Sequence, residues 1–399
     1  MNKTNTANDA QLITGAFFMS ILGALMALTS LSTDIYLPAM PTMAKELGGN
    51  AELTITGFLA GFTIAQLVWG PISDSIGRKK PLYTGMLIFV VGAAGCAMSY
   101  SIEQIVFWRV VQAVGACTGP MLARAMIRDL YSRTKAAQML STLMIIMAIA
   151  PIIGPLLGGQ IIRVSNWHGI FWLLTVIGAL MFVSLFWLPE TLSKEKRVPA
   201  TIGKAFVNYR FLLRHKTFMR FTLCVTFYYV AAYAFIAGSP IIYISYFGIA
   251  PQNYGWLFAV NILGVMILSF ANRYLVYHMS LHRLLQIATA ISLVAIIAMA
   301  AFVRAELYGI QIIVCMVFIF FSMNGIIAAS ATAAALDEVS HIAGSASALI
   351  GALQYGSGII SSVLLAVFSK GAPWTMTWVM LLFTAASFLT VLGKSEKYS

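Results

Sequence analysis

Charged residues are scarce in this sequence: they make up 10% of its 399 residues, against about 25% in soluble globular chains. Acidic residues are the scarcest, with 13 Asp and Glu beside 25 Lys and Arg, a net charge of +12. A nucleic-acid-binding protein gathers its basic residues on a solvated face, whereas here sparse charges separate long apolar runs. Hydrophobic residues make up 60% of the chain. This balance excludes a cytosolic enzyme, a disordered regulator and a disulfide-framed secreted domain, and it indicates a polytopic membrane protein.

Cysteine is also rare, and each of the four cysteines stands alone in an apolar run. They are Cys96, Cys117, Cys224 and Cys315. No CxxC motif or Cys/His metal spacing occurs, so we expect small hydrophobic residues in packed helices, with no disulfide and no metal site. The sequence also lacks a GxxxxGK[ST] loop and any cluster of His, Cys, Asp and Glu at one depth. We therefore expect no enzyme and no cofactor, and any pumping by this chain has to draw on an ion gradient.

Long apolar segments account for twelve membrane crossings, since a spanning helix needs roughly 20 apolar residues. Stretches free of Asp, Glu, Lys and Arg cover 10–33, 53–73, 81–102, 136–162, 164–189, 284–303, 307–336, 339–369 and 371–393. The stretch 104–123 is interrupted only by Arg109, and 221–272 breaks around 247–253 into two crossings. The sequence therefore predicts an all-α membrane protein.

The basic residues predict its orientation. Twenty Lys and Arg fall on the loops of the N-terminal side and four on the other side; with Arg109 they account for all 25. The positive-inside rule then places both termini in the cytoplasm. The longest basic loop, 190–220, divides the chain into six-helix bundles at 1–189 and 221–399, the parallel-repeat arrangement of many secondary transporters.

Asp34 is one of very few charges near a membrane span. It either ends the first span at the outer surface or lies buried, and the apolar run 35–43, interrupted only by Thr42, favours burial. Pro38 and Pro41 are expected to bend this outer segment. An intramembrane acid is a functional candidate by default, because a charge there costs roughly 2.5–3.5 kcal/mol even on lenient scales. A carboxylate in a low-dielectric cavity can exchange a proton during transport, so Asp34 is the candidate proton-coupling acid.

Arg109 lies too deep in the fourth span for its guanidinium to reach the surface easily. Gln112, one turn along, shares its helix face, and Asp34 is the nearby acid of plausible depth. Arg109 either ties helices together or tunes the protonation of Asp34 or of nearby water.

Two further motifs have an ordered spacing. Between the second and third spans, the spacing of Gly70, Asp74, Gly77 and Arg78 predicts a tight cytoplasmic turn. Asp129 is the expected partner of Arg78. The residues of this relay are Gly70, Asp74, Gly77, Arg78, Arg128 and Asp129. The fifth span concentrates Pro and Gly, which predicts a bent and closely packed helix. Its motif residues are Pro151, Gly154, Pro155, Gly158 and Gly159.

Polar and aromatic side chains within apolar spans are candidates for substrate binding. They are Tyr36, Gln112, Tyr229, Tyr233, Asn261, Asn324 and Gln354. Intramembrane polar residues can equally join helices, at about 0.6 kcal/mol each on average. Substrate identity does not follow from them.

Together these motifs resemble the major facilitator superfamily over essentially the whole chain. The segment 70–82 resembles its loop motif GxLaDrxGrkxxl, with Ser75 in place of a usual Arg. Arg109, Gln112 and Gly115 resemble the fourth-span motif RxxqGxgaa, and the fifth-span residues resemble the motif that marks exporters. The segments 34–38 and 343–346, with Gln354, are similar to the bicyclomycin/chloramphenicol resistance (Bcr/CflA) branch of drug:proton antiporters.

The resemblance implies specific roles. Asp34 would be the proton-coupling acid and Arg109 its buried partner, while Asp74, Arg78 and Asp129 would form a charge relay that latches the outward-facing state. Asp74 would then face the start of the eleventh span. Some such antiporters carry a second acid two turns before Asp34, where this chain has Met26. We therefore expect a single titrating acid and a preference for neutral or weakly charged substrates.

The sequence thus favours a monomeric bacterial inner-membrane exporter that exchanges external protons for a small amphipathic drug such as a phenicol or bicyclomycin. One alternative keeps the fold but carries a metabolite such as a purine nucleoside, an amino acid or a sugar. Another is a membrane receptor or channel without transport activity. The expected partners are a small molecule, protons and the lipid bilayer, and no nucleic acid.

Overall fold

The computed structural model describes residues 16–197, 202–307, 309–339, 342–368 and 371–392. All regular elements in these ranges are helical, as expected where the membrane core offers the backbone no water to bond. In chain order they are α2 (Ala16–Asp34), η1 (Leu37–Ala39), α3 (Met40–Leu47), α4 (Glu52–Ile76), α5 (Lys79–Ala97), α6 (Ile102–Ala116), α7 (Thr118–Leu130), α8 (Arg133–Val164), α9 (Trp167–Ser184), η2 (Leu185–Trp187), η3 (Lys194–Lys196), α10 (Ile202–Arg214), α11 (Lys216–Pro240), the π-helical η4 (Ile241–Tyr246), α12 (Pro251–Leu275), α13 (Leu281–Arg304), α14 (Ile310–Ser322), α15 (Asn324–Asp337), α16 (Ala343–Phe368) and α17 (Pro373–Val391).

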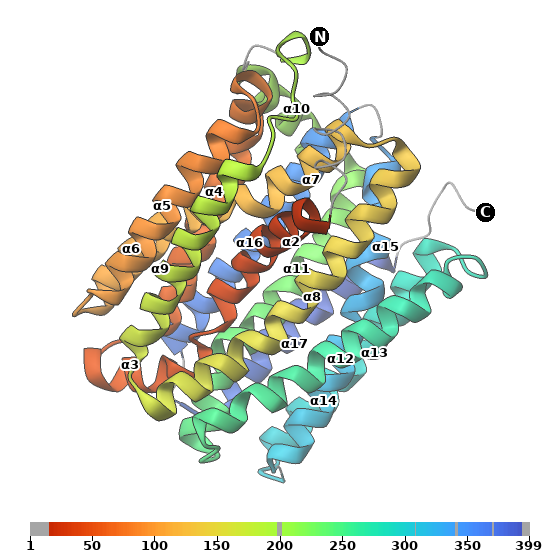
Figure 1. Ribbon diagram of the computed structural model, residues 1–399. Helices are drawn as coiled ribbons and strands as arrows, with labels where there is room; N and C mark the ends of the chain where they lie inside the picture. Colours follow the sequence, from red (N-terminus) through yellow and green to blue (C-terminus); the bar gives the residue numbers. More distant parts are fainter. Residues whose placement is uncertain (1–15, 198–201, 308, 340–341, 369–370, 393–399) are drawn as a thin grey trace.

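Twelve helical segments in the described residues are long and apolar enough to cross a membrane, which confirms the number expected from the sequence. Five of them consist of two or three helical elements in tandem: α2 with η1 and α3, α6 with α7, α9 with η2, α11 with η4, and α14 with α15. These are the first, fourth, sixth, seventh and tenth crossings. The first, fourth, seventh and tenth crossings recur at intervals of three helices, and the division into two six-helix bundles stays a prediction. Figure 1 shows the long helices inclined together in one bundle.

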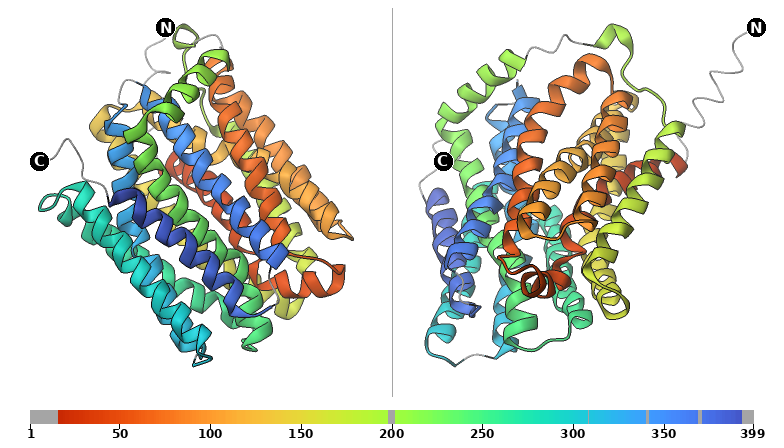
Figure 2. Two further views of the ribbon diagram at one scale, coloured as in Figure 1. Left: turned by 180° about the vertical axis from the view of Figure 1, so that it is seen from behind. Right: turned by 90° about the vertical axis from the view of Figure 1, so that its left-hand side faces the viewer.

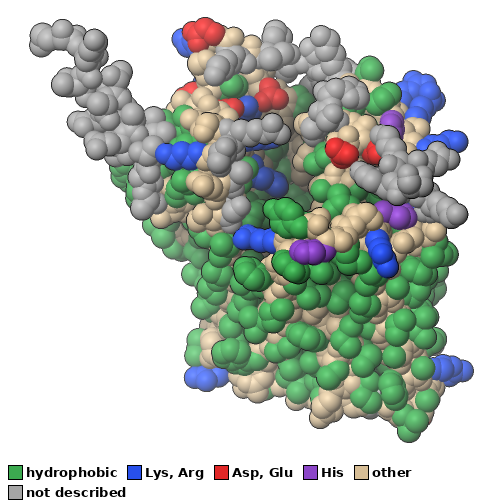
Figure 3. Space-filling model, turned by 90° about the vertical axis from the view of Figure 1, so that its right-hand side faces the viewer, with side chains coloured by type: hydrophobic (Ala, Val, Ile, Leu, Met, Phe, Trp, Pro, Cys, Tyr) green, Lys and Arg blue, Asp and Glu red, His purple; other side chains and the backbone are tan. Residues whose placement is uncertain are grey.

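The two halves touch mainly through two pairs of helices, α4 with α16 and α8 with α12. Contacts continue to the ends of these helices that lie away from most of the Lys and Arg, here called the outer end, where Asn50 Nδ2 donates to the carbonyl of Ala366 (2.8 Å). Gly159 of α8 lies against the backbone of Pro251 at the start of α12. The opposite end, which carries most of the Lys and Arg, is hollowed between two lobes (Figure 3). The molecule is thus closed at its outer end and open at its basic end.

A broad hydrophobic band covers the lower part of the face seen in Figure 3. Large apolar side chains are strongly exposed along the spans, for example Phe270 (74% exposed), Val294 (66%) and Leu389 (65%). Such a surface is stable against lipid and not against water. Cys96, Cys117 and Cys224 are buried as expected, but Cys315 is exposed, so its expected packing inside the protein was wrong.

Two segment boundaries differ from the sequence expectation. The first span continues past residue 33 through η1 and α3 to Leu47, because Pro38 and Pro41 each stand in the first turn of a new short helix. The fourth span continues past residue 123 to Leu130. Gly70 lies inside α4 and not in the expected turn, which begins only at Gly77.

Candidate functional site

Asp34 is the last residue of α2, where the first span breaks before η1. It is 7% exposed, so the outer segment of the span covers it as the apolar run 35–43 indicated. The break leaves the chain locally free of regular helix between Asp34 and Leu37. A titratable group is therefore held at an interruption of a membrane helix, the kind of place at which transporters position their ionic groups.

The glycines of α8 lie directly against this break. A methyl group on Gly154 would lie 3.3 Å from both the Cβ of Asp34 and the backbone N of Ile35, and one on Gly158 would collide with the carbonyl oxygen of Ile35. Pro151 and Pro155 are accommodated within the continuous helix α8. The dense Gly and Pro pattern of the fifth span thus serves a close approach of α8 to the backbone at Asp34.

Arg109 is completely buried in α6, and its contacts join it to the first span. Its Nη1 donates to the carbonyl of Ser32 (2.9 Å) and to Oε1 of Gln112 (2.7 Å), the neighbour expected from the helical spacing. The guanidinium carbon lies 4.5 Å from the centre of the Tyr36 ring and 4.3 Å from that of Phe58, a cation–π arrangement.

The structure does not pair Arg109 with the Asp34 carboxylate: among the described residues no ion pair joins them. Arg109 instead holds the backbone of Ser32, two residues before the acid. Its Nε and Nη2 are buried and have no acceptor within the described part of the chain. Arg109 thus brings a positive charge close to Asp34 without a direct bond to it.

Three of the seven candidate substrate residues are inaccessible in this conformation. Tyr36 is fully buried and its hydroxyl bonds Thr54 (3.0 Å), while Gln112 is fully buried against Arg109. Asn261 is 1% exposed and donates to the carbonyl of Leu257 in its own helix (3.3 Å). These three residues line no accessible path in this conformation, and their role in substrate binding stays a prediction. Polar residues that hydrogen-bond within or between helices look the same in sequence.

The other four candidates are half-buried, and three of them, Tyr229, Tyr233 and Asn324, lie close together. Tyr229 and Tyr233 of α11 have ring centres 6.2 Å apart, and the side chain of Asn324 in α15 lies close to Tyr229. Gln354 in α16 is also half-buried. Beside Gln354, Tyr355 packs on Phe62 of α4 with ring centres 4.1 Å apart. These helices contribute a wall of aromatic and amide groups that spans both halves.

Arg124 is a residue that the sequence reasoning placed in a loop. It lies in α7 with an exposed side chain, its Nε donates to the carbonyl of Pro120 (2.8 Å), and its charge interacts with Tyr355 of the other half. No acid pairs with it in the described residues. The apolar run Ala125, Met126 and Ile127 that follows it was the available signal that the span continues.

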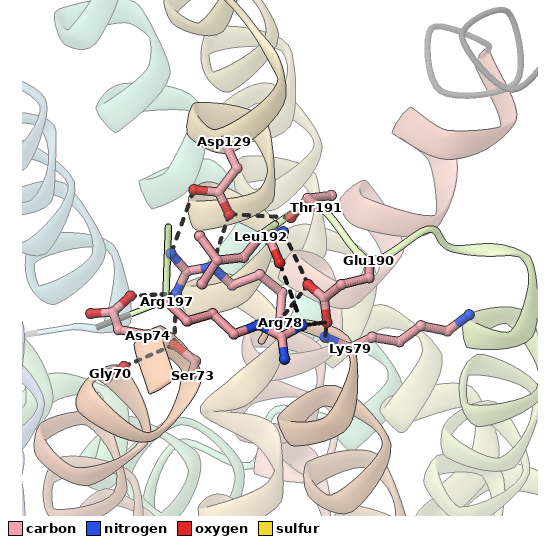
Figure 4. Close-up of polar contacts among 10 residues, drawn as sticks. All are labelled: Gly70, Ser73, Asp74, Arg78, Lys79, Asp129, Glu190, Thr191, Leu192 and Arg197. Carbon is pink, nitrogen blue, oxygen red and sulfur yellow. Dashed lines mark hydrogen bonds and ion pairs between the residues drawn. The ribbon is translucent and has the colours of Figure 1, made fainter. Parts of the chain in front are cut away.

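The second cluster lies at the basic end and centres on Arg78, between α4 and α5 (Figure 4). Its Nε donates to Asp129 at the end of α7 (2.8 Å), and its Nη1 donates to Asp74 (2.5 Å) and Ser73 (2.9 Å). Burial acts to lower the pKa of Arg78, but the hydrogen bonds and charges of Asp129 and Asp74 outweigh it and raise that pKa above its ordinary value. Arg78 therefore stays charged and ties α4 to α7.

The segment after the sixth span completes this cluster, and sequence reasoning missed it. The Glu190 carboxylate accepts the backbone N–H groups of Arg78 (2.9 Å) and Lys79 (3.2 Å), which begin α5, and an acid is favourable at a helix N-terminus. Glu190 also pairs with Arg197 (3.8 Å), and Thr191 donates to Asp129 (3.2 Å). The acid directly after Leu188-Pro189 was the one signal available.

The remaining relay residues differ in their contacts. Gly77 has φ +99°, and a Cβ there would lie 2.8 Å from Nη2 of Arg197, so only glycine fits. Gly70 faces open space. Arg128 is exposed and has no ion-pair partner in the ranges that the structure describes, so it lies outside the network into which the sequence grouped it.

This architecture has known counterparts. The Major Facilitator Superfamily profile matches residues 22–362, most of the chain. The chain belongs to the Major Facilitator Superfamily. The Bacillus subtilis protein named uncharacterized MFS-type transporter YdgK is 34% identical over 357 residues, covering 87% of this chain and 88% of that one. The sequence resemblance to the superfamily is confirmed, and the protein is a transporter and not an enzyme.

Relatives within the superfamily include proteins named for drug resistance. The bicyclomycin resistance protein homolog of Haemophilus influenzae is 29% identical over 367 residues, 91% of this chain and 92% of that one. Multidrug resistance protein D of Escherichia coli is 26% identical over 349 residues, 86% and 87% of the two chains. The solved nucleoside transporter NupG has a TM-score of 0.74 at 12% identity, covering 94% of this chain and 97% of its own, and confirms the fold.

Proposed function

We propose that this protein is a proton-coupled exporter of small amphipathic compounds, of the phenicol or bicyclomycin kind, that works by alternating access. Asp34 carries the transported proton, and Arg109 positions the segment that holds it. The proton gradient is the energy source and no cofactor takes part. The drug-resistance names of the Haemophilus influenzae and Escherichia coli relatives support this substrate class.

The observation that carries the proposal is the setting of Asp34. The acid is 7% exposed and lies at a break of the first span. The α8 glycines Gly154 and Gly158 lie against the backbone of Asp34 and Ile35, and Asp34 is two residues from Ser32, whose carbonyl accepts a hydrogen bond from Arg109. A purely structural acid would be expected to pair with Arg109. A buried carboxylate that lies near a guanidinium but forms no ion pair with it is instead suited to gain and lose a proton as its surroundings change.

The closed outer end and the hollow basic end define one half of the cycle. Substrate enters from the basic end and meets the wall formed by Tyr229, Tyr233 and Tyr355. Rocking of the halves at the α4–α16 and α8–α12 contacts opens the outer end, where Asp34 takes up a proton as substrate leaves. Return to the present state releases this proton inward. Substrate and proton are thus coupled because each favours a different conformation.

Electrostatics restrict the substrate. Met26, at the place where some drug antiporters have a second acid, is fully buried, and Arg124 presents an exposed positive charge near Tyr355. A permanent cation would therefore be repelled without a compensating carboxylate. Neutral or weakly charged aromatic compounds suit this wall best.

The cluster around Arg78 is the proposed conformational latch. The side chain of Asp74 is 56% exposed, and no polar contact joins it to α16 among the described residues. Gly344, at the start of α16, faces open space. In the outward-facing state Asp74 would meet this helix N-terminus, whose dipole favours an acid. We further propose that the protein is a monomer of the bacterial inner membrane, with both termini in the cytoplasm, and that its two bundles are 1–189 and 221–399.

Proton release from purified protein tests this proposal. In weakly buffered detergent solution, phenicols, bicyclomycin, nucleosides and amino acids are added in turn to the wild type, to Asp34→Asn and to Asp337→Asn. Asp337 is an exposed carboxylate at the end of α15 and serves as the matched control. We expect phenicols or bicyclomycin to release protons from the wild type and the control but not from Asp34→Asn. Release caused only by a metabolite would overturn the drug assignment, and equal release from Asp34→Asn would exclude this acid.

A further inference from the structure

A cavity of about 510 Å³ lies at the basic end, outside the substrate wall. Its lining comes from three helices: α4, the short helix α10 and α16. The lining residues are Leu67, Tyr209, Arg210, Leu213, Arg214 and Leu349. Because α4 belongs to the first half of the chain and α16 to the second, the cavity bridges both halves. Figure 2 shows α10 on the outside of the bundle, beside α4 and α16.

The cavity combines two free cations with apolar walls. Arg210 and Arg214 are one helical turn apart, are both exposed, and have no acidic partner in the part of the chain that the structure describes. The walls are formed by Leu67, Leu213 and Leu349. A ligand that fits must carry a negative charge at one end and a hydrocarbon portion at the other.

Helix α10 is built to lie at a membrane surface. Val207, Phe211 and Leu213 are 68%, 48% and 52% exposed, yet they share one short helix with the two arginines. Exposed apolar side chains next to basic ones are typical of helices that lie in the headgroup region of a bilayer. The next span begins at Lys216, so α10 lies at the depth of the lipid headgroups at the basic end.

We propose that this cavity binds one anionic phospholipid of the cytoplasmic leaflet. The guanidinium groups of Arg210 and Arg214 bind the headgroup phosphate, for which the planar fork of arginine is suited. The proximal part of an acyl chain packs on Leu213, Leu67 and Leu349. Bound lipid thus connects α10 with both halves in the state that is open at the basic end.

Native mass spectrometry of the full-length, delipidated protein tests the proposal with three probes. Palmitoyl-oleoyl phosphatidylglycerol is the anionic lipid, phosphatidylcholine with the same chains is the zwitterionic control, and glycerol 3-phosphate is the headgroup without chains. We expect one tightly retained phosphatidylglycerol and no comparable retention of the other two. Arg210→Gln with Arg214→Gln should weaken its binding roughly tenfold to thirtyfold, since each basic residue near a lipid surface contributes on the order of 1 kcal/mol.

Two control variants separate this cavity from general attraction to a basic surface. Arg273→Gln with Arg283→Gln removes the same charge from another exposed part of the basic end and should leave the tight binding unchanged. Leu213→Trp fills the cavity at an exposed position without a change of charge and should weaken phosphatidylglycerol binding. The proposal is overturned if both arginine pairs have equal effects, if Leu213→Trp has none, or if glycerol 3-phosphate competes as well as the lipid.

Discussion

Arg109 leaves part of its hydrogen-bonding capacity unused. Of the donors that a guanidinium offers, Nη1 binds the Ser32 carbonyl and Gln112, while Nε and Nη2 have no acceptor in the described residues. The rings of Tyr36 and Phe58 flank the charge. Arg109 is thus a buried cation near Asp34 that bonds the backbone of Ser32 and forms no ion pair with the Asp34 carboxylate among the described residues.

Arg109→Lys tests whether this geometry matters beyond the charge. Lysine keeps the positive charge but cannot bind Ser32 and Gln112 while stacking between two rings, so we expect proton-driven transport to fall roughly tenfold or more in a folded protein. Transport is measured in proteoliposomes and folding by thermal unfolding. Arg304→Lys, at an exposed helix end, is the control and should transport normally. Normal transport by Arg109→Lys would show that the charge alone suffices.

At this scale the sequence predicts what helical spacing encodes. The contact of Arg109 with Gln112 follows from three residues of separation on one helix, and the pairing of Arg78 with Asp129 follows from two charges at the same membrane face. The bond of Arg109 to a backbone carbonyl does not follow, because backbone groups are exposed by the helix break after Asp34. The role of Glu190 also escapes, since it binds backbone N–H groups that every sequence has.

Three glycines allow α8 to pack closely against neighbouring backbone. Gly154 and Gly158 contact the backbone of Asp34 and Ile35 in the same half, and Gly159 contacts Pro251 at the start of α12 in the other half. Glycines of α8 therefore contact both the helix break at Asp34 and the start of α12. Movement of α12 against α8 can reach Asp34 through this contact.

Gly158→Ala should disrupt this packing. The added methyl group meets the carbonyl of Ile35, a backbone atom that cannot move aside without shifting the Asp34 segment, so we expect a loss of roughly 1–3 kcal/mol in stability and reduced transport. Thermal unfolding and proteoliposome transport measure the two effects. Gly238→Ala in α11, where the added methyl group would make ordinary contacts with Met376 (3.4 Å) and Leu365 (3.5 Å), is the matched control and should be nearly neutral. Equal behaviour of the two variants would contradict the close approach.

Apolar run length was sufficient to predict the twelve spans, because each helix has to bury its backbone across the same thickness of lipid. It was not sufficient for the interruptions within the first, fourth and tenth spans. There the hydrophobic pattern continues across the break, and only local prolines and glycines, such as Pro38 and Pro120, mark it. Span ends at Leu47 and Leu130 were missed for the same reason.

The whole molecule is a bundle that is closed at one end and open at the other. Contacts between α4 and α16 and between α8 and α12 hold the outer end together, and the hollow lies at the basic end (Figure 3). Counting Lys and Arg predicts which end faces the cytoplasm, because that signal depends on insertion into the membrane. It does not predict which end is open, because one sequence has to encode the contacts of both states.

Transport in proteoliposomes tests the central claim, that Asp34 couples substrate export to proton entry. Labelled chloramphenicol is offered outside vesicles with an acidic interior, which drives uptake by an antiporter in either orientation. The wild type should accumulate the label. Asp34→Asn should not, yet it should still exchange labelled for unlabelled compound without a pH gradient. Accumulation by Asp34→Asn at the wild-type rate, or wild-type accumulation that is indifferent to the gradient, would contradict this mechanism.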